Sequence, residues 1–167
     1  SYRKSYASNK KLGGGVLLTC SHEIDIAQNL FGKVSKVFCT DTLTNLKSSV
    51  ENSVFIILKH KNGVKSNITL DFSSKQNQRK FEITGENFNI NWNFNKKQIL
   101  IIKENRFFKK ITKSSSHINK IYLSQNSTYL KNLYKKQNKN FDNLFHTERI
   151  ILTALKSLRL KKTLSLI

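Results

Sequence analysis

GGGVLLTCSHEID, residues 13–25, decides the fold, because three glycines run directly into a helix-period pattern. From residue 16 to residue 31 apolar side chains recur at three- and four-residue spacing, which predicts an amphipathic helix with one apolar stripe. Gly32 stands where the residue that ends a helix is expected. The segment therefore predicts a helix that begins at a flexible, side-chain-free stretch and carries His22 and Asp25 beside its apolar stripe.

After this helix the hydrophobic period changes to two, which predicts strands. Asn62-Gly63 between two apolar runs is a strong hairpin signal. Further on, apolar residues alternate with asparagines from residue 88 to residue 95, the pattern of a sheet with one buried and one wet face. The strands are predicted at residues 37–42, 53–60, 64–72, 80–84, 88–95 and 98–103.

The helical period returns toward the end of the chain. Residues 104–120 are polar and basic and are predicted to form a loop. Helices are predicted around residues 129–137 and 150–158, the second with Thr147 as its N-cap. Residues 163–167 could add a short strand, and the polar, basic residues 1–11 are predicted to form an arm that leads into the first helix.

This order of elements indicates an α+β fold. We predict one largely antiparallel open sheet with helices packed on one face, in a single domain over residues 1–167. A chain of 167 residues is long enough to bury one core of this kind. The uncovered face of such a sheet would need a partner, so we expect homo-oligomer contacts through it.

His22 is the first candidate for chemistry. On a helix it shares a face with Leu18, away from the apolar stripe, and Asp25 lies three residues further on. Asp25 could orient or stabilise the imidazole, as in histidines that transfer protons near neutral pH. The alternative is an ordinary surface histidine near a helix end. Cys20 is two residues from His22, about 200° around a helix, so the two are not expected to form a catalytic dyad.

Several kinds of site have no signal in the sequence. The four histidines and two cysteines show no spacing typical of a metal site. The triple glycine lacks the GxGxxG pattern and has no strand before it, so we expect no cofactor-binding residues in this chain. Apolar runs are too short to cross a membrane, and the two cysteines suggest reduced thiols in the cytoplasm.

The formal charge of +20 is the most unusual property of the composition. Residues 101–167 hold 15 basic and 3 acidic residues, which fits a basic nucleic-acid-binding domain as one hypothesis. However, only five of the 30 basic residues are arginines, and the lysines are scattered. Nucleic-acid readers rely on arginine forks. A lysine-rich composition is therefore the favoured explanation, with no specific nucleic-acid partner.

One longer stretch carries a resemblance to a known family. The run SYRKSYASNKKLGGGVLLTCSHEIDIAQNLFGKV resembles the start of the C-terminal domain in the glucose–fructose oxidoreductase / inositol dehydrogenase (Gfo/Idh/MocA) family. The resemblance continues through NGVKSNITLDF, ITGENFNINW and ERIILTALKS, and so covers nearly the whole chain.

The resemblance implies a two-domain enzyme that oxidises or reduces a carbinol of a sugar, cyclitol or nucleotide-linked sugar. An N-terminal Rossmann domain would bind NAD or NADP, and this chain would supply one wall of the substrate site and the oligomer contacts. By resemblance, His22 is the catalytic acid/base or substrate-hydroxyl partner. Substrate-binding roles fall to Asp25 and to the arm residues Tyr2, Arg3 and Tyr6.

Two departures from the family pattern matter. Many members carry an aspartate four residues before the histidine, where this chain has Leu18. The family's catalytic lysine belongs to the Rossmann domain, which this chain does not contain, and there is no methionine anywhere in it. We therefore expect a fragment of a larger protein that is inactive alone. The remaining alternative is a non-catalytic module that dimerises through its sheet.

Overall fold

The computed structural model describes residues 5–42, 48–104, 106–112, 118–134 and 142–166 of the chain. Contacts between residues divide the chain into two compact units. The first consists of Ser1–Ser74 and Asn140–Ile167, and the second of Lys75–Lys139. That residues 1–167 act as a single domain stays a prediction.

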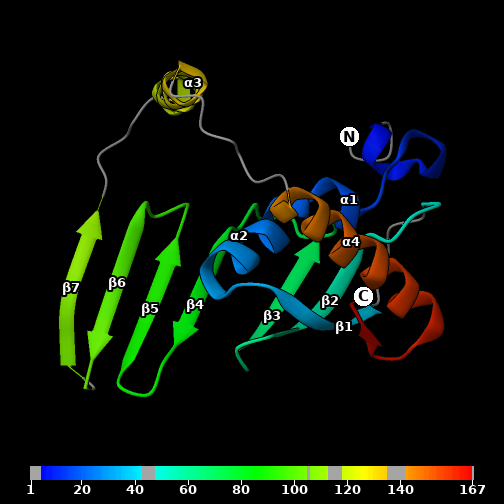
Figure 1. Ribbon diagram of the computed structural model, residues 1–167, viewed down its shortest axis with the longest axis horizontal. Coiled ribbons are helices and arrows are strands. Elements are labelled where there is room, and N and C mark those ends of the chain that lie inside the picture. The colour runs from blue at the N-terminus through cyan, green and yellow to red at the C-terminus, as the bar shows by residue number, and fades with distance from the viewer. Residues whose placement is uncertain (1–4, 43–47, 105, 113–117, 135–141, 167) are drawn as a thin grey trace. The chain divides into compact units, whose positions relative to one another are not determined.

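The first unit is built on a four-stranded antiparallel sheet in the order β3-β2-β1-β8 (Figure 1). β2 and β3 form the predicted hairpin, in which the His60 N–H donates to the Val64 carbonyl at 2.8 Å. Side chains alternate in burial along β1 and β2, because successive residues of a strand point to opposite faces. The strands are β1 (Val34–Asp41), β2 (Ser53–His60), β3 (Lys65–Asp71) and β8 (Leu164–Ser165).

Helices α1, α2 and α4 pack on this sheet and close its core (Figure 1). Leu17 and Ile24 of the first two helices, Ile150 of α4, and Val37 and Ile56 of the sheet are all fully buried. Each such burial stabilises the fold by about 1.5–3 kcal/mol. The helices are α1 (Val16–Thr19), α2 (Ser21–Phe31) and α4 (Asp142–Leu160), preceded by the 3₁₀ turns η2 (Tyr6–Ser8) and η3 (Lys10–Leu12). The predicted α+β class is thereby confirmed.

One serine of α4 completes the hydrogen bonding of β1. β8 spans two residues and pairs only with Lys36 and Val37 of β1 within the described residues. Beyond it, the Cys39 N–H donates to Ser157 Oγ at 2.9 Å, and Ser157 Oγ donates to the Lys162 carbonyl at 2.7 Å. Because Ser157 is fully buried, its hydroxyl takes the place of a neighbouring strand.

His146 joins α4 to the start of β1. The Val34 N–H donates to His146 Nε2 at 3.1 Å, which requires a neutral ring nitrogen as acceptor. Burial lowers the pKa of His146, and the charges of Lys33, Lys61 and Arg149 lower it further. All of these effects disfavour the imidazolium, so they favour the form that accepts this bond. His146 itself lies within α4.

The second unit contains another four-stranded antiparallel sheet, in the order β4-β5-β6-β7. Neighbours in this sheet are also neighbours in the chain, so the strands form a simple meander. They are β4 (Lys80–Thr84), β5 (Phe88–Asn93), β6 (Gln98–Lys103) and β7 (Arg106–Thr112), and helix α3 spans Ile118–Tyr134. The predicted antiparallel strands are thus divided between two sheets rather than one.

One face of the second sheet carries an aromatic cluster. Phe81 stacks on Trp92 with ring centroids 4.9 Å apart, and Phe94 meets Trp92 edge-on at 5.9 Å. The sequence predicted a buried face here. Among the residues of this unit whose burial is described, however, none reaches the buried class, and Phe94 is 52% exposed. Among the side chains whose burial is described, the apolar face of this sheet is therefore only partly buried.

The predicted loop over residues 104–120 is wrong. Arg106–Thr112 forms strand β7, which pairs with β6, and α3 begins at Ile118. The strand was missed because its basic residues hide the alternation, yet charged side chains are common on strands at the edge of a sheet. The part of the prediction that falls on residues 113–117 lies outside the described residues.

Two predictions about helix ends also fail. The helix predicted from residue 16 onward is interrupted at Cys20, whose φ of −103° and ψ of 30° are not helical, so α1 and α2 are separate. Thr147 is not an N-cap, because α4 begins at Asp142 and Thr147 is buried inside the helix. Its hydroxyl is used in a contact with another helix. Gly32, in contrast, ends α2 as predicted, and its N–H donates to the Gln28 carbonyl.

Candidate active site

The triple glycine brings the N-terminal arm onto the start of α1. The Gly14 N–H donates to the Asn9 carbonyl and the Gly15 N–H donates to the Ala7 carbonyl, both at 2.9 Å. A Cβ at Gly14 would lie 2.6 Å from the carbonyl oxygens of both Tyr6 and Ala7. No side chain fits at that distance, so glycine is required for the arm to pack here.

Glu51 holds the start of α1 from the other side. The Glu51 carbonyl accepts from the Val16 N–H at 3.1 Å, and Glu51 Oε1 accepts from the Leu17 N–H at 3.2 Å. The first N–H groups of a helix have no partner within the helix, so Glu51 acts as their cap. Burial raises the pKa of Glu51, while the hydrogen bond from Leu17 opposes that rise. A Cβ at Gly15 would collide with this carboxylate.

His22 lies in the first turn of α2 and points to solvent. Its side chain is 55% exposed, whereas Ile24 two residues later is fully buried. The predicted separation of His22 from the apolar stripe is therefore confirmed. His22 Nε2 lies 3.2 Å from Glu23 Oε1, and the Glu23 side chain is 25% exposed. Within the described residues, the carboxylate in contact with the His22 imidazole is therefore that of Glu23.

Asp25 is engaged elsewhere. Its Oδ1 accepts from the hydroxyl of Thr147 on α4 at 3.2 Å, and its carbonyl accepts from Asn29 Nδ2 at 2.9 Å. The contact between Asp25 and Thr147 joins residues 122 positions apart and ties α2 to α4. The structure therefore does not bring the carboxylate of Asp25 to His22 in the way that the sequence suggested.

Of the three predicted substrate-binding residues in the arm, the structure describes only Tyr6. Tyr6 lies in η2 with 59% of its surface exposed, so its ring is accessible to a ligand. Tyr2 and Arg3 lie outside the described residues. Leu18, at the position where an aspartate was expected by resemblance, is 42% exposed in α1 and contributes no acid.

The residues present do not fit a dinucleotide cofactor. A Rossmann site needs a strand, a glycine-rich turn and a helix within a parallel sheet. Here the triple glycine follows the 3₁₀ turn η3, and both sheets in the described part of the chain are antiparallel. The described residues also contain no group of three or more His, Cys, Asp or Glu side chains that could hold a metal ion. An exposed imidazole beside a carboxylate, as at His22 and Glu23, is a type of group that can accept and donate protons.

Sequence reasoning missed three residues of this region. Glu51 lies 34 positions from Leu17 and no motif surrounds it, so nothing in the sequence signals its role. Thr147 is predicted from the sequence only as an N-cap, and not as the partner of Asp25. Glu23 follows His22 directly in the sequence. It is not predicted as its partner, because neighbouring residues on a helix do not normally face each other.

Comparison with known families gives a match over the N-terminal half of the chain. The model of the GFO/IDH/MocA C-terminal domain matches residues 2–91. None of the curated protein sequences matches this chain. No helix in the described ranges is long and apolar enough to cross a membrane.

Several solved structures share this fold. An NAD binding oxidoreductase from Klebsiella pneumoniae has a TM-score of 0.86 and 12% identity, covering 98% of this chain and 54% of its own. Levoglucosan dehydrogenase in complex with NADH and levoglucosan has a TM-score of 0.83 and 15% identity, covering 97% and 53%. An oxidoreductase from Agrobacterium radiobacter, in complex with NAD+, L-tartaric acid and magnesium, has a TM-score of 0.72 and 18% identity. The match covers 88% of this chain and 47% of that protein. The chain thus spans about half the length of these proteins.

The close approach at Gly14 leads to a stability prediction. We expect Gly14→Ala to lower the free energy of unfolding by about 2–3 kcal/mol, because the new Cβ meets backbone oxygens that cannot move independently. Gly13→Ala is the matched control, since it has open space around it and costs only the left-handed backbone strain of about 1–2 kcal/mol. Urea unfolding followed by circular dichroism measures both. An equal or smaller loss at Gly14 would show that the arm does not pack as described.

Proposed function

Because this chain belongs to the GFO/IDH/MocA family through its C-terminal domain, we propose that it supplies the substrate side of an NAD(P)-dependent oxidoreductase. The substrate is a carbinol of a sugar, cyclitol or nucleotide-linked sugar. The observation that carries this proposal is His22, which is exposed on α2 beside a carboxylate. The ligands named for the similar structures, levoglucosan, L-sorbose and L-tartaric acid, are all polyhydroxylated, which supports this substrate class.

In this proposal His22 moves the proton of the substrate hydroxyl. During oxidation the hydroxyl oxygen gives its proton to the imidazole, while the hydrogen on the carbinol carbon would leave as a hydride to NAD(P)+ held by another part of the enzyme. During reduction both would return. Since Nε2 faces Glu23, the other ring nitrogen, Nδ1, is the one that meets the substrate. Glu23 is a positioning residue, because its carboxylate lies 3.2 Å from Nε2 and so orients the ring. Glu23 thus takes the role of the aspartate that many family members carry at the position of Leu18.

The remaining contacts to substrate are assigned to the arm and to Asp25. Tyr6 is exposed, and the glycine contacts hold its turn next to the start of α1. Tyr2 and Arg3 keep their proposed substrate-binding roles from the family resemblance. Asp25 also fixes the orientation of α2 through Thr147, so its loss would disturb the helix as well as the substrate. The nicotinamide site belongs to a part of the enzyme outside these residues, and the chain alone is inactive.

We further propose that the protein works in a reducing compartment such as the cytoplasm. Cys39 is a buried thiol that forms no disulfide in the structure. Burial raises the pKa of Cys39 to about 12, with Glu51 and Asp41 adding to the rise. The thiolate is the reactive form of cysteine, so Cys39 is a packing residue rather than a reactive one.

Oligomer contacts are proposed for the apolar face of the second sheet. Register places the side chains of Phe81 and Trp92 opposite each other, and Ile90 opposite both Ile83 and Ile101, on this one face. None of these side chains is buried within the chain. A second copy of the chain, offering the same apolar face, would remove this surface from water.

The catalytic roles are tested in the enzyme that joins this chain to its nicotinamide-binding domain. We expect His22→Ala to lower kcat by about 10²–10⁴-fold while the KM for NAD(H) stays within about threefold. Glu23→Gln should lower kcat less than His22→Ala does, because the imidazole is kept and only the carboxylate that orients it is lost. Glu86→Gln is the control, as it neutralises an exposed glutamate of the other unit. Unchanged turnover in His22→Ala would remove His22 from the reaction.

The oligomer proposal is tested by a pair of neighbouring substitutions in β5. We expect Ile90→Lys to convert the oligomer to a monomer, because the charge would be buried in the interface. Asn91→Lys is the control, since adjacent residues of a strand point to opposite faces. Sedimentation velocity gives the molecular mass of each. A wild-type monomer, or equal behaviour of the two variants, would contradict an interface on this face.

A further inference from the structure

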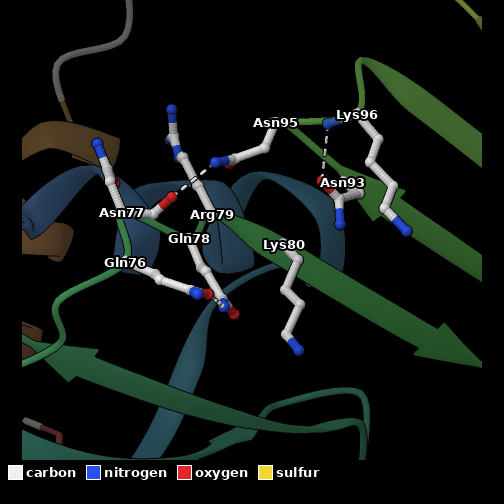
Figure 2. Close-up of a pocket in the computed structure, with 8 residues that line it drawn as sticks. All are labelled: Gln76, Asn77, Gln78, Arg79, Lys80, Asn93, Asn95 and Lys96. Atoms are coloured by element: carbon white, nitrogen blue, oxygen red, sulfur yellow. Dashed lines mark hydrogen bonds between the residues drawn. The ribbon is translucent and has the colours of Figure 1, made fainter.

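A hollow of about 560 Å³ lies at one end of the second sheet, where β4 begins and β5 ends (Figure 2). All of its lining residues belong to the second unit, whereas His22 and Glu23 belong to the first. None of the lining residues is acidic: three are basic and five carry side-chain amides. They are Gln76, Asn77, Gln78, Arg79, Lys80, Asn93, Asn95 and Lys96.

The basic side chains are arranged by the sheet. Lys80 pairs in register with Asn93, so the ammonium and the amide stand on the same face of the sheet. The Lys96 N–H donates to Asn93 Oδ1 at 2.9 Å, which places Lys96 next to the same amide. Figure 2 shows the side chains of Lys80 and Lys96 extending toward the same side. Lys80 and Lys96 therefore both line the hollow and extend toward the same side of it.

Arg79 is held on the other side. Its guanidinium carbon lies 5.6 Å from the centre of the Trp92 ring, within the range of a cation–π interaction. In Figure 2 its side chain extends away from that of Lys80. Arg79 therefore adds positive charge to the surroundings, while Lys80 and Lys96 are the groups placed to contact an anion directly.

Hydrogen bonds organise the amides of the wall. Asn95 Nδ2 donates to the Asn77 carbonyl at 2.6 Å, and Gln78 Nε2 donates to Gln76 Oε1 at 2.9 Å. An amide offers both donors and acceptors, and so does a sugar hydroxyl, which makes amides suited to binding sugars. The wall therefore presents exposed amides, two of them hydrogen-bonded to each other, together with two lysines.

We infer that this hollow binds a phosphorylated sugar, with the phosphate on Lys80 and Lys96 and the hydroxyls on the amide wall. Its volume falls within the range of about 300–1,000 Å³ that small-ligand sites occupy. A phosphate group carries nearly two negative charges, which matches two lysines without a competing carboxylate. The net charge of +20 would draw any anion toward the chain, but only this composition of the wall selects a sugar. The inference does not depend on the proposed oxidoreductase function.

The test is isothermal titration calorimetry of the 167-residue chain with glucose 6-phosphate, glucose and inorganic phosphate at fixed ionic strength. We expect saturable binding of glucose 6-phosphate to one site, no detectable binding of glucose, and weaker binding of inorganic phosphate. Replacing both Lys80→Gln and Lys96→Gln should weaken binding of glucose 6-phosphate at least about tenfold, because two charge-assisted contacts are lost.

The matched control is the double variant Lys103→Gln and Lys109→Gln. It removes the same charge from exposed lysines of the same sheet that do not line the hollow. Fluorescence of Trp92, the only tryptophan, checks that every variant keeps the sheet folded. The inference is overturned if both double variants bind glucose 6-phosphate equally, or if inorganic phosphate binds as tightly as the sugar phosphate.

Discussion

The backbone at Gly14 approaches the carbonyl oxygens of Tyr6 and Ala7 so closely that only glycine can stand there. Next to it, Glu51 caps the first N–H groups of α1 with its own carbonyl and carboxylate. The arm and the start of α1 meet here with the loop before β2, which supplies Glu51 from 34 positions further along the chain than Leu17. The position of α2 depends on it, because α2 follows α1 after one residue.

The same constraint explains why the polar side of α2 is available for chemistry. Ile24 faces the core and Asp25 is bonded to Thr147 of α4, so the helix cannot rotate without losing both contacts. His22 is then presented to solvent with its imidazole beside Glu23, whose side chain is 25% exposed. A site that takes its precision from a rigid, buried face of the same helix is a common arrangement for catalytic groups.

Much of this fold could be predicted from the sequence, because periodicity reports which side of an element is buried. The stripe from Val16 to Phe31, the Asn62-Gly63 turn and the alternation in β5 were sufficient for the α+β class. The contacts that build the site were not predictable, since they join distant residues through single hydrogen bonds. Glu51 to Leu17 and Asp25 to Thr147 leave no periodic trace. The charged strand β7 was missed for the opposite reason, as its composition outweighed its pattern.

The central claim is that this chain provides the substrate side of a dehydrogenase and that the cofactor is bound elsewhere. Titration of the 167-residue chain with NADH, followed by nicotinamide fluorescence, tests this claim most directly. The account predicts no saturable change in fluorescence, because the antiparallel sheets and the turn before the triple glycine cannot form a dinucleotide site. Saturable binding of one NADH per chain would contradict it.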